Sequence, residues 1–61
     1  MKVSELKKLL RKHGCKQDGE YKEHDRWYSP LTDKFFAVPR HNSKEIPVGT
    51  ANRILKDAGL K

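Results

Sequence analysis

Residues 22–28 read Lys-Glu-His-Asp-Arg-Trp-Tyr, and this stretch decides how the rest of the chain can be arranged. Successive side chains of an extended strand point to opposite faces. The side chains that would share one face are those of His24, Arg26 and Tyr28. Asp25 and Trp27 would point the other way, where the indole can pack into a core. The pattern predicts a strand anchored by Trp27 that exposes His24, although an ordinary surface histidine on a solvated strand has the same pattern.

An amphipathic helix is predicted before this strand. Its apolar stripe has residues three and four positions apart, namely Leu6, Leu9, Leu10 and His13. Ser4 is the predicted N-cap and Gly14 the left-handed residue after the helix, which gives a range of 4–13. The opposite side is basic and carries Lys7, Lys8, Arg11 and Lys12. This basic side is either simply solvated or in contact with phosphates.

A second helix is predicted near the C-terminus. Its apolar stripe consists of Ala51, Ile54, Leu55 and Ala58. It begins at Thr50 as a cap, or already at Pro47 in the first turn, and Gly59 ends it.

Residues 34–38, Lys-Phe-Phe-Ala-Val, form the strongest predicted strand, and a turn containing Pro30 joins it to residues 22–28 as an antiparallel hairpin. The polar residues 15–20 are ambiguous as a further strand, and Asp18-Gly19 indicates a turn or bulge. The order is therefore helix, two or three strands, helix. This order predicts a two-layer α+β sandwich with both helices on the Trp27 face. Either Phe35 or Phe36 would join Trp27 in the core.

The chain has 61 residues and a formal net charge of +6, so we expect one small domain that attracts polyanions. A large enclosed pocket is not expected at this size. The single cysteine excludes an internal disulfide, and the three scattered histidines do not complete a structural zinc set. We therefore expect no metal and no cofactor. Neither an apolar signal region nor a membrane-spanning stretch is apparent, which predicts a cytoplasmic protein and no membrane partner.

The ordered motifs of the chain resemble the HicA family of bacterial toxins over essentially the whole length. The motifs are an N-terminal Ser-Glu-Leu-Lys-Lys-Leu-Leu helix, a strand histidine followed by an aromatic, Ala37-Val38-Pro39-Arg40-His41, Glu45-Ile46-Pro47, and Gly49-Thr50-Ala51-Asn52-Arg53-Ile54-Leu55-Lys56-Asp57-Ala58-Gly59-Leu60. No single motif is decisive, but the set in this order and at these spacings is fairly specific. The resemblance predicts that residues 1–61 are a single HicA-like toxin domain.

The resemblance implies an α-β-β-β-α fold like that of double-stranded-RNA-binding domains. It also implies a metal-independent ribonuclease that cuts mRNA and is held inactive by a HicB-type antitoxin in a hetero-oligomer. The family's catalytic histidine lies on the middle strand, and His24 is the match. The family often has glycine one or two residues before that histidine, where this chain has Lys22 and Glu23. These side chains in place of glycine predict either a weaker ribonuclease activity or a different substrate preference.

RNA carries its own nucleophile, the 2′-hydroxyl, so a small protein needs only to move protons and stabilise charge. We predict that His24 is the general acid or base. The predicted RNA-binding residues are Lys22, Arg26, Tyr28 and Arg40. The residues leave the second proton-transfer group unidentified. Tyr28 qualifies by its face alone. His41 could lie near the path of the substrate, although a loop histidine is more often an ordinary surface residue.

Two other functions fit the same residues. A noncatalytic RNA-binding module of the same fold would read A-form RNA by shape and bind without making products. A DNA-binding module is a weaker fit, because the strands separate the two helices and no compact helix-turn-helix pair is apparent.

Overall fold

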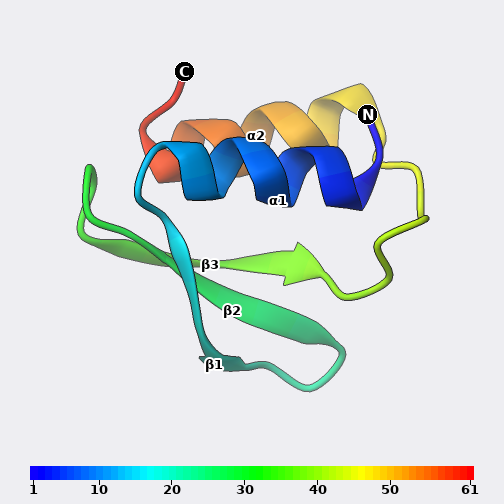
Figure 1. Ribbon diagram of the computed structural model, residues 1–61, viewed down its shortest axis with the longest axis horizontal. Helices are drawn as coiled ribbons and strands as arrows, with labels where there is room; N and C mark the ends of the chain where they lie inside the picture. The colour runs from blue at the N-terminus through cyan, green and yellow to red at the C-terminus, as the bar shows by residue number, and fades with distance from the viewer.

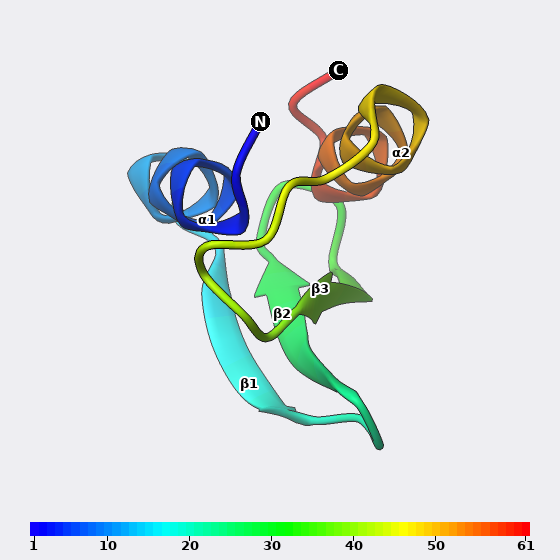
Figure 2. The ribbon, with the colours of Figure 1, turned by 90° about the vertical axis from the view of Figure 1, so that its right-hand side faces the viewer.

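The computed structural model describes residues 1–61, which form two helices and one three-stranded sheet. The elements are α1 (Val3–Lys12), β1 (Lys16–Glu20), β2 (His24–Ser29), β3 (Lys34–Pro39) and α2 (Val48–Ala58). The sheet is antiparallel in the order β1-β2-β3. Figures 1 and 2 show both helices on one face of the sheet, with the other face uncovered. The predicted α-β-β-β-α sandwich is confirmed, and the ambiguous residues 16–20 are its third strand.

The core lies between the sheet and the helices, and β2 supplies its centre. Trp27 has no exposed surface, whereas His24, on the opposite face of β2, is exposed. Phe36 faces inward and Phe35 faces outward, which decides between the two phenylalanines. The remaining core residues are Val3, Leu6, Leu10, Cys15, Val38, Ile46, Ala51, Ile54 and Ala58. Leu9 was expected in the core but is only half-buried, because the buried stripe of α1 consists of Val3, Leu6, Lys7 and Leu10 and leaves Leu9 at its edge.

The loop of residues 40–47 caps the first helix, so the prediction that Ser4 is its N-cap is wrong. Helix α1 begins one residue earlier, at Val3. The amide of Val3 donates to the carbonyl of Lys44 at 2.9 Å, and the amide of Ser4 donates to the carbonyl of Asn42 at 3.0 Å. These loop carbonyls satisfy amides that would otherwise lack an intrahelical partner. The contacts also fasten the loop to the start of the chain.

The second helix begins at Val48 with Pro47 as its N-cap, so Thr50 lies within the first turn rather than before it. Its C-terminal end is as predicted, because Gly59 is left-handed with φ of 84°. The amide of Leu60 donates to the carbonyl of Leu55 at 2.9 Å, which closes the helix end.

A bulge in β1 confirms the Asp18-Gly19 signal. The pairing of β1 with β2 shifts register between Gln17 and Glu20, and Gly19 has φ of 95°. A Cβ atom at Gly19 would lie 2.9 Å from Nη2 of Arg26. Glycine therefore allows both the left-handed backbone and the close approach of the Arg26 guanidinium.

Ser29 ties the β2–β3 turn to the end of α2, and its removal is expected to destabilise the fold. Its buried hydroxyl donates to the carbonyl of Ala58 at 2.6 Å and accepts from the amide of Leu31 at 3.2 Å. Ser29→Ala leaves both backbone groups without this partner, which costs about 1–3 kcal/mol of unfolding free energy. Urea unfolding followed by the fluorescence of Trp27 measures the loss.

Ser4→Ala is the matched control for that measurement. The Ser4 side chain is exposed and does not cap α1, so its loss is expected to change stability by less than about 0.5 kcal/mol. Equal losses for the two serine variants would contradict both the Ser29 contacts and the capping of α1 by loop carbonyls.

Candidate functional site

His24 is the first residue of β2 and lies where two surface hollows meet. In the antiparallel pairing of β2 with β3, His24 lies opposite Pro39, the last residue of β3. Both residues line both hollows. The open face of the sheet therefore presents the predicted catalytic histidine at a junction, with a different chemical surface on each side.

The basic hollow has a volume of about 510 Å³ and polar walls. Besides Pro39, its lining residues are Lys22, Glu23, His24, Arg40, His41 and Lys44. It brings together three of the predicted site residues, Lys22, His24 and Arg40. Sequence reasoning assigned no role to His41 and Lys44. His41 was considered only as a loop histidine in the motif Ala37–His41, and Lys44 lies further along the same loop, whose path the sequence pattern does not define.

The apolar hollow has a volume of about 640 Å³ and lies between β3 and α2. Half of its lining residues are hydrophobic; besides His24 and Pro39, the lining residues are Tyr21, Phe35, Phe36, Ala37, Thr50, Arg53, Ile54 and Asp57. Tyr21 is 43% exposed and Phe35 is 49% exposed, so two aromatic rings are available to a ligand on this side of His24. Exposed aromatic rings are the usual stacking surface for unpaired nucleobases.

Arg26 and Tyr28 share the His24 face, as predicted, but they line neither hollow. The Arg26 guanidinium stacks 4.8 Å from the ring centroid of Phe35, and its Nη2 lies 3.8 Å from a carboxylate oxygen of Asp18. The Tyr28 ring also packs on Phe35, with 5.1 Å between centroids. These two residues form a second group on the sheet face, away from the junction at His24.

The hydroxyl of Tyr28 donates a hydrogen bond to the carboxylate of Asp33. This hydrogen bond raises the pKa of Tyr28, and desolvation and the negative charge of Asp33 add to the effect. The phenol therefore keeps its proton to a higher pH than an ordinary tyrosine, and that proton is directed at Asp33 rather than toward His24.

A buried ion-pair network lies beneath the site, on the opposite face of β2 from His24. Asp25 is 6% exposed and Lys7 is 8% exposed. Nζ of Lys7 lies 3.6 Å from Oδ2 of Asp25 and donates to Oδ1 of Asn42 at 2.9 Å and to the carbonyl of Arg40 at 3.4 Å. Oδ1 of Asp25 accepts from Nε of Arg40 at 3.1 Å. The ammonium thus has two hydrogen-bond acceptors and a carboxylate counter-charge, which offsets the cost of burying it.

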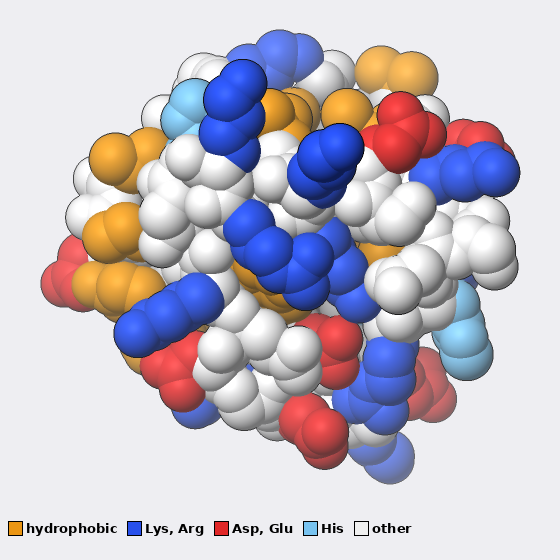
Figure 3. All heavy atoms as spheres, viewed as in Figure 1, with side chains coloured by type: hydrophobic (Ala, Val, Ile, Leu, Met, Phe, Trp, Pro, Cys, Tyr) orange, Lys and Arg blue, Asp and Glu red, His pale blue; other side chains and the backbone are white.

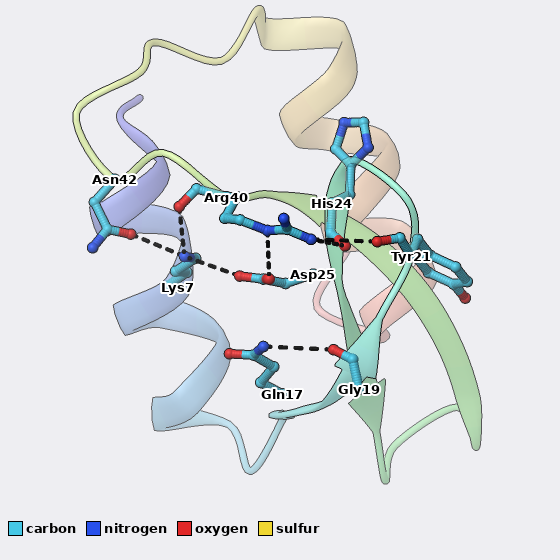
Figure 4. Close-up of polar contacts among 8 residues, drawn as sticks. All are labelled: Lys7, Gln17, Gly19, Tyr21, His24, Asp25, Arg40 and Asn42. Atoms are coloured by element: carbon cyan, nitrogen blue, oxygen red, sulfur yellow. Dashed lines mark hydrogen bonds and ion pairs between the residues drawn. The ribbon is translucent and has the colours of Figure 1, made fainter.

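Arg40 connects this network to the backbone around His24. Its Nη2 donates to the carbonyl of His24 at 3.1 Å and to that of Tyr21 at 3.3 Å. The amide of Tyr21 donates to the same His24 carbonyl at 2.8 Å, which closes the turn between β1 and β2. Figure 4 shows the His24 imidazole pointing away from the Asp25 carboxylate, so Asp25 does not orient the ring directly. It holds Arg40, and Arg40 holds the turn.

The burial of Lys7 contradicts the expectation that the whole basic side of α1 is exposed. Lys7 is buried in the network and is unavailable to phosphates, while the other three basic residues of that face stay exposed. Figure 3 shows Lys and Arg side chains gathered over the α1 side of the molecule. The guanidinium carbon of Arg11, a basic residue of α1, lies 5.3 Å from the centroid of the Trp27 ring. This cation covers the core and so has a structural role.

No cluster of three or more His, Cys, Asp or Glu residues in this chain could hold a metal ion. Neither helix is long or apolar enough to cross a membrane.

The fold and the site together define a class: a small α+β sandwich whose open sheet face carries a histidine between a basic and an aromatic surface. A family model described as "HicA toxin of bacterial toxin-antitoxin" matches residues 3–60. The chain therefore belongs to the HicA toxin family and is the toxin of a bacterial toxin–antitoxin system, which implies an antitoxin partner. No curated protein and no solved structure matched the chain.

Proposed function

We propose that this toxin is a metal-independent endoribonuclease that cleaves mRNA in the cytoplasm, with His24 as a general acid or base. The observation that carries the proposal is the exposed His24 at the junction of the basic and apolar hollows. A histidine at such a junction can reach a phosphodiester whose charge lies on one side and whose base lies on the other. Residues 1–61 would form a single HicA-like toxin domain.

The chemistry needs little from the protein, because the nucleophile is the 2′-hydroxyl of the RNA. Proton transfer by a positioned side chain contributes roughly 10²–10⁴-fold to such a reaction. Lys22, Lys44 and Arg40 place positive charge beside His24, where it would stabilise the phosphate as charge develops in the transition state. Arg26 and Tyr28 would contact the RNA further along the sheet face.

The apolar hollow favours a single-stranded substrate. An unpaired base can turn toward the rings of Tyr21 and Phe35, whereas the bases of an A-form duplex are stacked on one another. Lys22 and Glu23, where the family often has glycine, form part of the wall of the basic hollow, so side chains narrow the approach to His24 on that side.

A HicB-type antitoxin is the proposed inhibitor. The exposed basic surface attracts an acidic partner, and such attraction speeds association more than it adds affinity. A partner that covers the two hollows would keep RNA from His24.

The alternative is a noncatalytic RNA-binding module. The basic hollow and the exposed rings would support binding in the same way, but no product would form. The cleavage measurements in the Discussion separate the two functions.

Removal of a lysine from the basic hollow is expected to weaken RNA binding through a lost phosphate contact. For Lys22→Gln and for Lys44→Gln, the slope of log affinity against log salt should fall by about 0.7, the value for one phosphate contact on a single strand. Binding is measured with a fluorescent single-stranded RNA in the His24→Ala background, so that no cleavage intervenes. Lys12→Gln makes the same charge change on α1, outside both hollows, and should leave the slope within about 0.2 of its original value. Equal slopes for all three variants would contradict binding at the basic hollow.

A further inference from the structure

The basic hollow has two walls that come from separate parts of the chain, and each wall carries one histidine. One wall is the segment of Lys22, Glu23 and His24 at the start of β2. The other follows β3 and includes Arg40, His41 and Lys44. His24 and His41 therefore line one hollow from two separate segments of the chain, and each segment also contributes a lysine.

The distance between these walls is fixed by hydrogen bonds. Nη2 of Arg40, the residue before His41, donates to the carbonyl of His24 at 3.1 Å. Nε of the same side chain is held by the buried carboxylate of Asp25 at 3.1 Å. One guanidinium thus joins the backbone of the His24 wall to the chain directly before His41.

The loop that carries His41 has no regular secondary structure, but hydrogen bonds also hold it to α1. The side-chain oxygen of Asn42 accepts from Nζ of Lys7 at 2.9 Å, and the backbone carbonyl of Asn42 accepts from the amide of Ser4 at 3.0 Å. The amide of Lys44 donates to the carbonyl of His41 at 3.1 Å, which closes a turn around this residue. Contacts on both sides of His41 thus hold its backbone to α1 and β2, while its side chain stays exposed.

Cleavage of RNA by its 2′-hydroxyl requires two proton transfers in opposite directions. The 2′-oxygen forms a bond to phosphorus as its proton leaves, and the bond from phosphorus to the 5′-oxygen breaks as that oxygen gains a proton. The products are a 2′,3′-cyclic phosphate and a 5′-hydroxyl. A base on one side of the phosphorus and an acid on the other side perform both transfers without a net change in protons.

We propose that His24 and His41 are this pair, acting on an RNA phosphate held between Lys22 and Lys44. One imidazole takes the proton of the 2′-hydroxyl, and the imidazolium of the other gives its proton to the 5′-oxygen. The inference rests on the proposed ribonuclease function and supplies the second proton-transfer group that His24 alone lacks. Tyr28 does not compete for this role, because its hydroxyl is bonded to Asp33 and it lies outside the hollow.

The test compares two substrates that differ in their need for an acid. One is a single-stranded RNA oligonucleotide, and the other has sulfur in place of the 5′-oxygen at the cleaved linkage, so that the leaving thiolate needs no proton. The proteins are the wild type, His24→Ala, His41→Ala and His41→Gln, with His13→Ala as control. His13 is an exposed histidine at the end of α1 that lines neither hollow.

On ordinary RNA, His24→Ala and both His41 variants should cleave roughly 10²–10⁴-fold more slowly than the wild type, and His13→Ala within about twofold. On the sulfur substrate, the variant that lacks the acid should recover to within about tenfold of the wild type, and the variant that lacks the base should not. Recovery of one histidine variant and not the other identifies the acid and supports the pair.

The results that would contradict the histidine pair differ from those that would contradict the ribonuclease function. Full cleavage of ordinary RNA by folded His41→Ala or His41→Gln, with His24→Ala inactive, would overturn the role of His41 and leave the proposed function intact. Recovery of both histidine variants on the sulfur substrate, or of neither, would also overturn the pair. Full cleavage by His24→Ala, or no cleavage by the wild type, would instead contradict the proposed ribonuclease site itself.

Discussion

Asp25→Ala is expected to lower the free energy of unfolding by about 3–5 kcal/mol, the usual cost of removing one partner from a buried ion pair. The substitution leaves the ammonium of Lys7 buried without its counter-charge, and it releases Nε of Arg40. A domain of this length has a total stability of only about 3–9 kcal/mol. We therefore expect a large part of the protein to be unfolded at 37 °C. The urea midpoint, followed by the fluorescence of the buried Trp27, measures the effect.

Asp18→Ala is the matched control, because it removes the same carboxylate from an exposed ion pair. Asp18 lies 3.8 Å from Nη2 of Arg26, and its side chain is 51% exposed. Exposed pairs of this kind contribute about 0–1 kcal/mol. A loss for Asp25→Ala no greater than that for Asp18→Ala would contradict the structural role of the buried network.

His24→Ala is expected to reduce cleavage of single-stranded RNA roughly 10²–10⁴-fold, with the loss in kcat rather than in KM. The side chain is exposed and makes no hydrogen bond within the protein, so its removal should leave the fold and RNA binding in place. Initial rates over a range of RNA concentrations, with chelator present, separate the two kinetic constants. Circular dichroism of both proteins confirms that the comparison is between folded chains.

His13→Ala accompanies that measurement and should cleave at the rate of the wild type. Cleavage by His24→Ala at the same rate as His13→Ala would place the chemistry elsewhere or reveal a contaminating nuclease. RNA binding by the wild type without cleavage would favour the noncatalytic module, or a toxin inactivated by the side chains that stand where the family often has glycine.

The parts of the fold that were predicted from sequence are those where apolar periodicity is strong. The two helices and the alternation around Trp27 follow from spacing alone, because side-chain direction along a helix or strand is periodic. Strand β1 remained ambiguous because all five of its residues are exposed, so it shows no alternation between apolar and polar residues. Its place in the sheet comes from backbone pairing with β2, which the side-chain pattern does not encode.

The burial of Lys7 and the capping of α1 could not be predicted, because both depend on the loop of residues 40–47. Lys7 has the spacing of a surface residue on the basic side of α1, and only the approach of Asn42, Arg40 and Asp25 makes its burial favourable. Loop carbonyls likewise replace the side-chain cap expected from Ser4. Contacts between residues that are far apart in the sequence leave no local periodic signal.

The candidate site was predicted at Lys22, His24 and Arg40, but its two loop residues His41 and Lys44 were not assigned to it. His24 and Lys22 belong to the alternating strand segment, and the resemblance of that segment supplied the role of His24. His41 and Lys44 lie in an irregular loop, where spacing carries no information about direction. The face shared by Arg26 and Tyr28 was predicted, but their engagement with Asp18, Asp33 and Phe35 depends on packing across the sheet.

The chemical ends of the RNA fragments test the central claim most directly. Purified toxin is incubated with a single-stranded RNA and excess chelator, and the fragments are analysed by mass spectrometry. Attack by the 2′-hydroxyl with histidine catalysis predicts 2′,3′-cyclic phosphates paired with 5′-hydroxyl ends. Fragments with 3′-hydroxyl and 5′-phosphate ends, or cleavage that disappears when chelator is added, would contradict a metal-independent ribonuclease centred on His24.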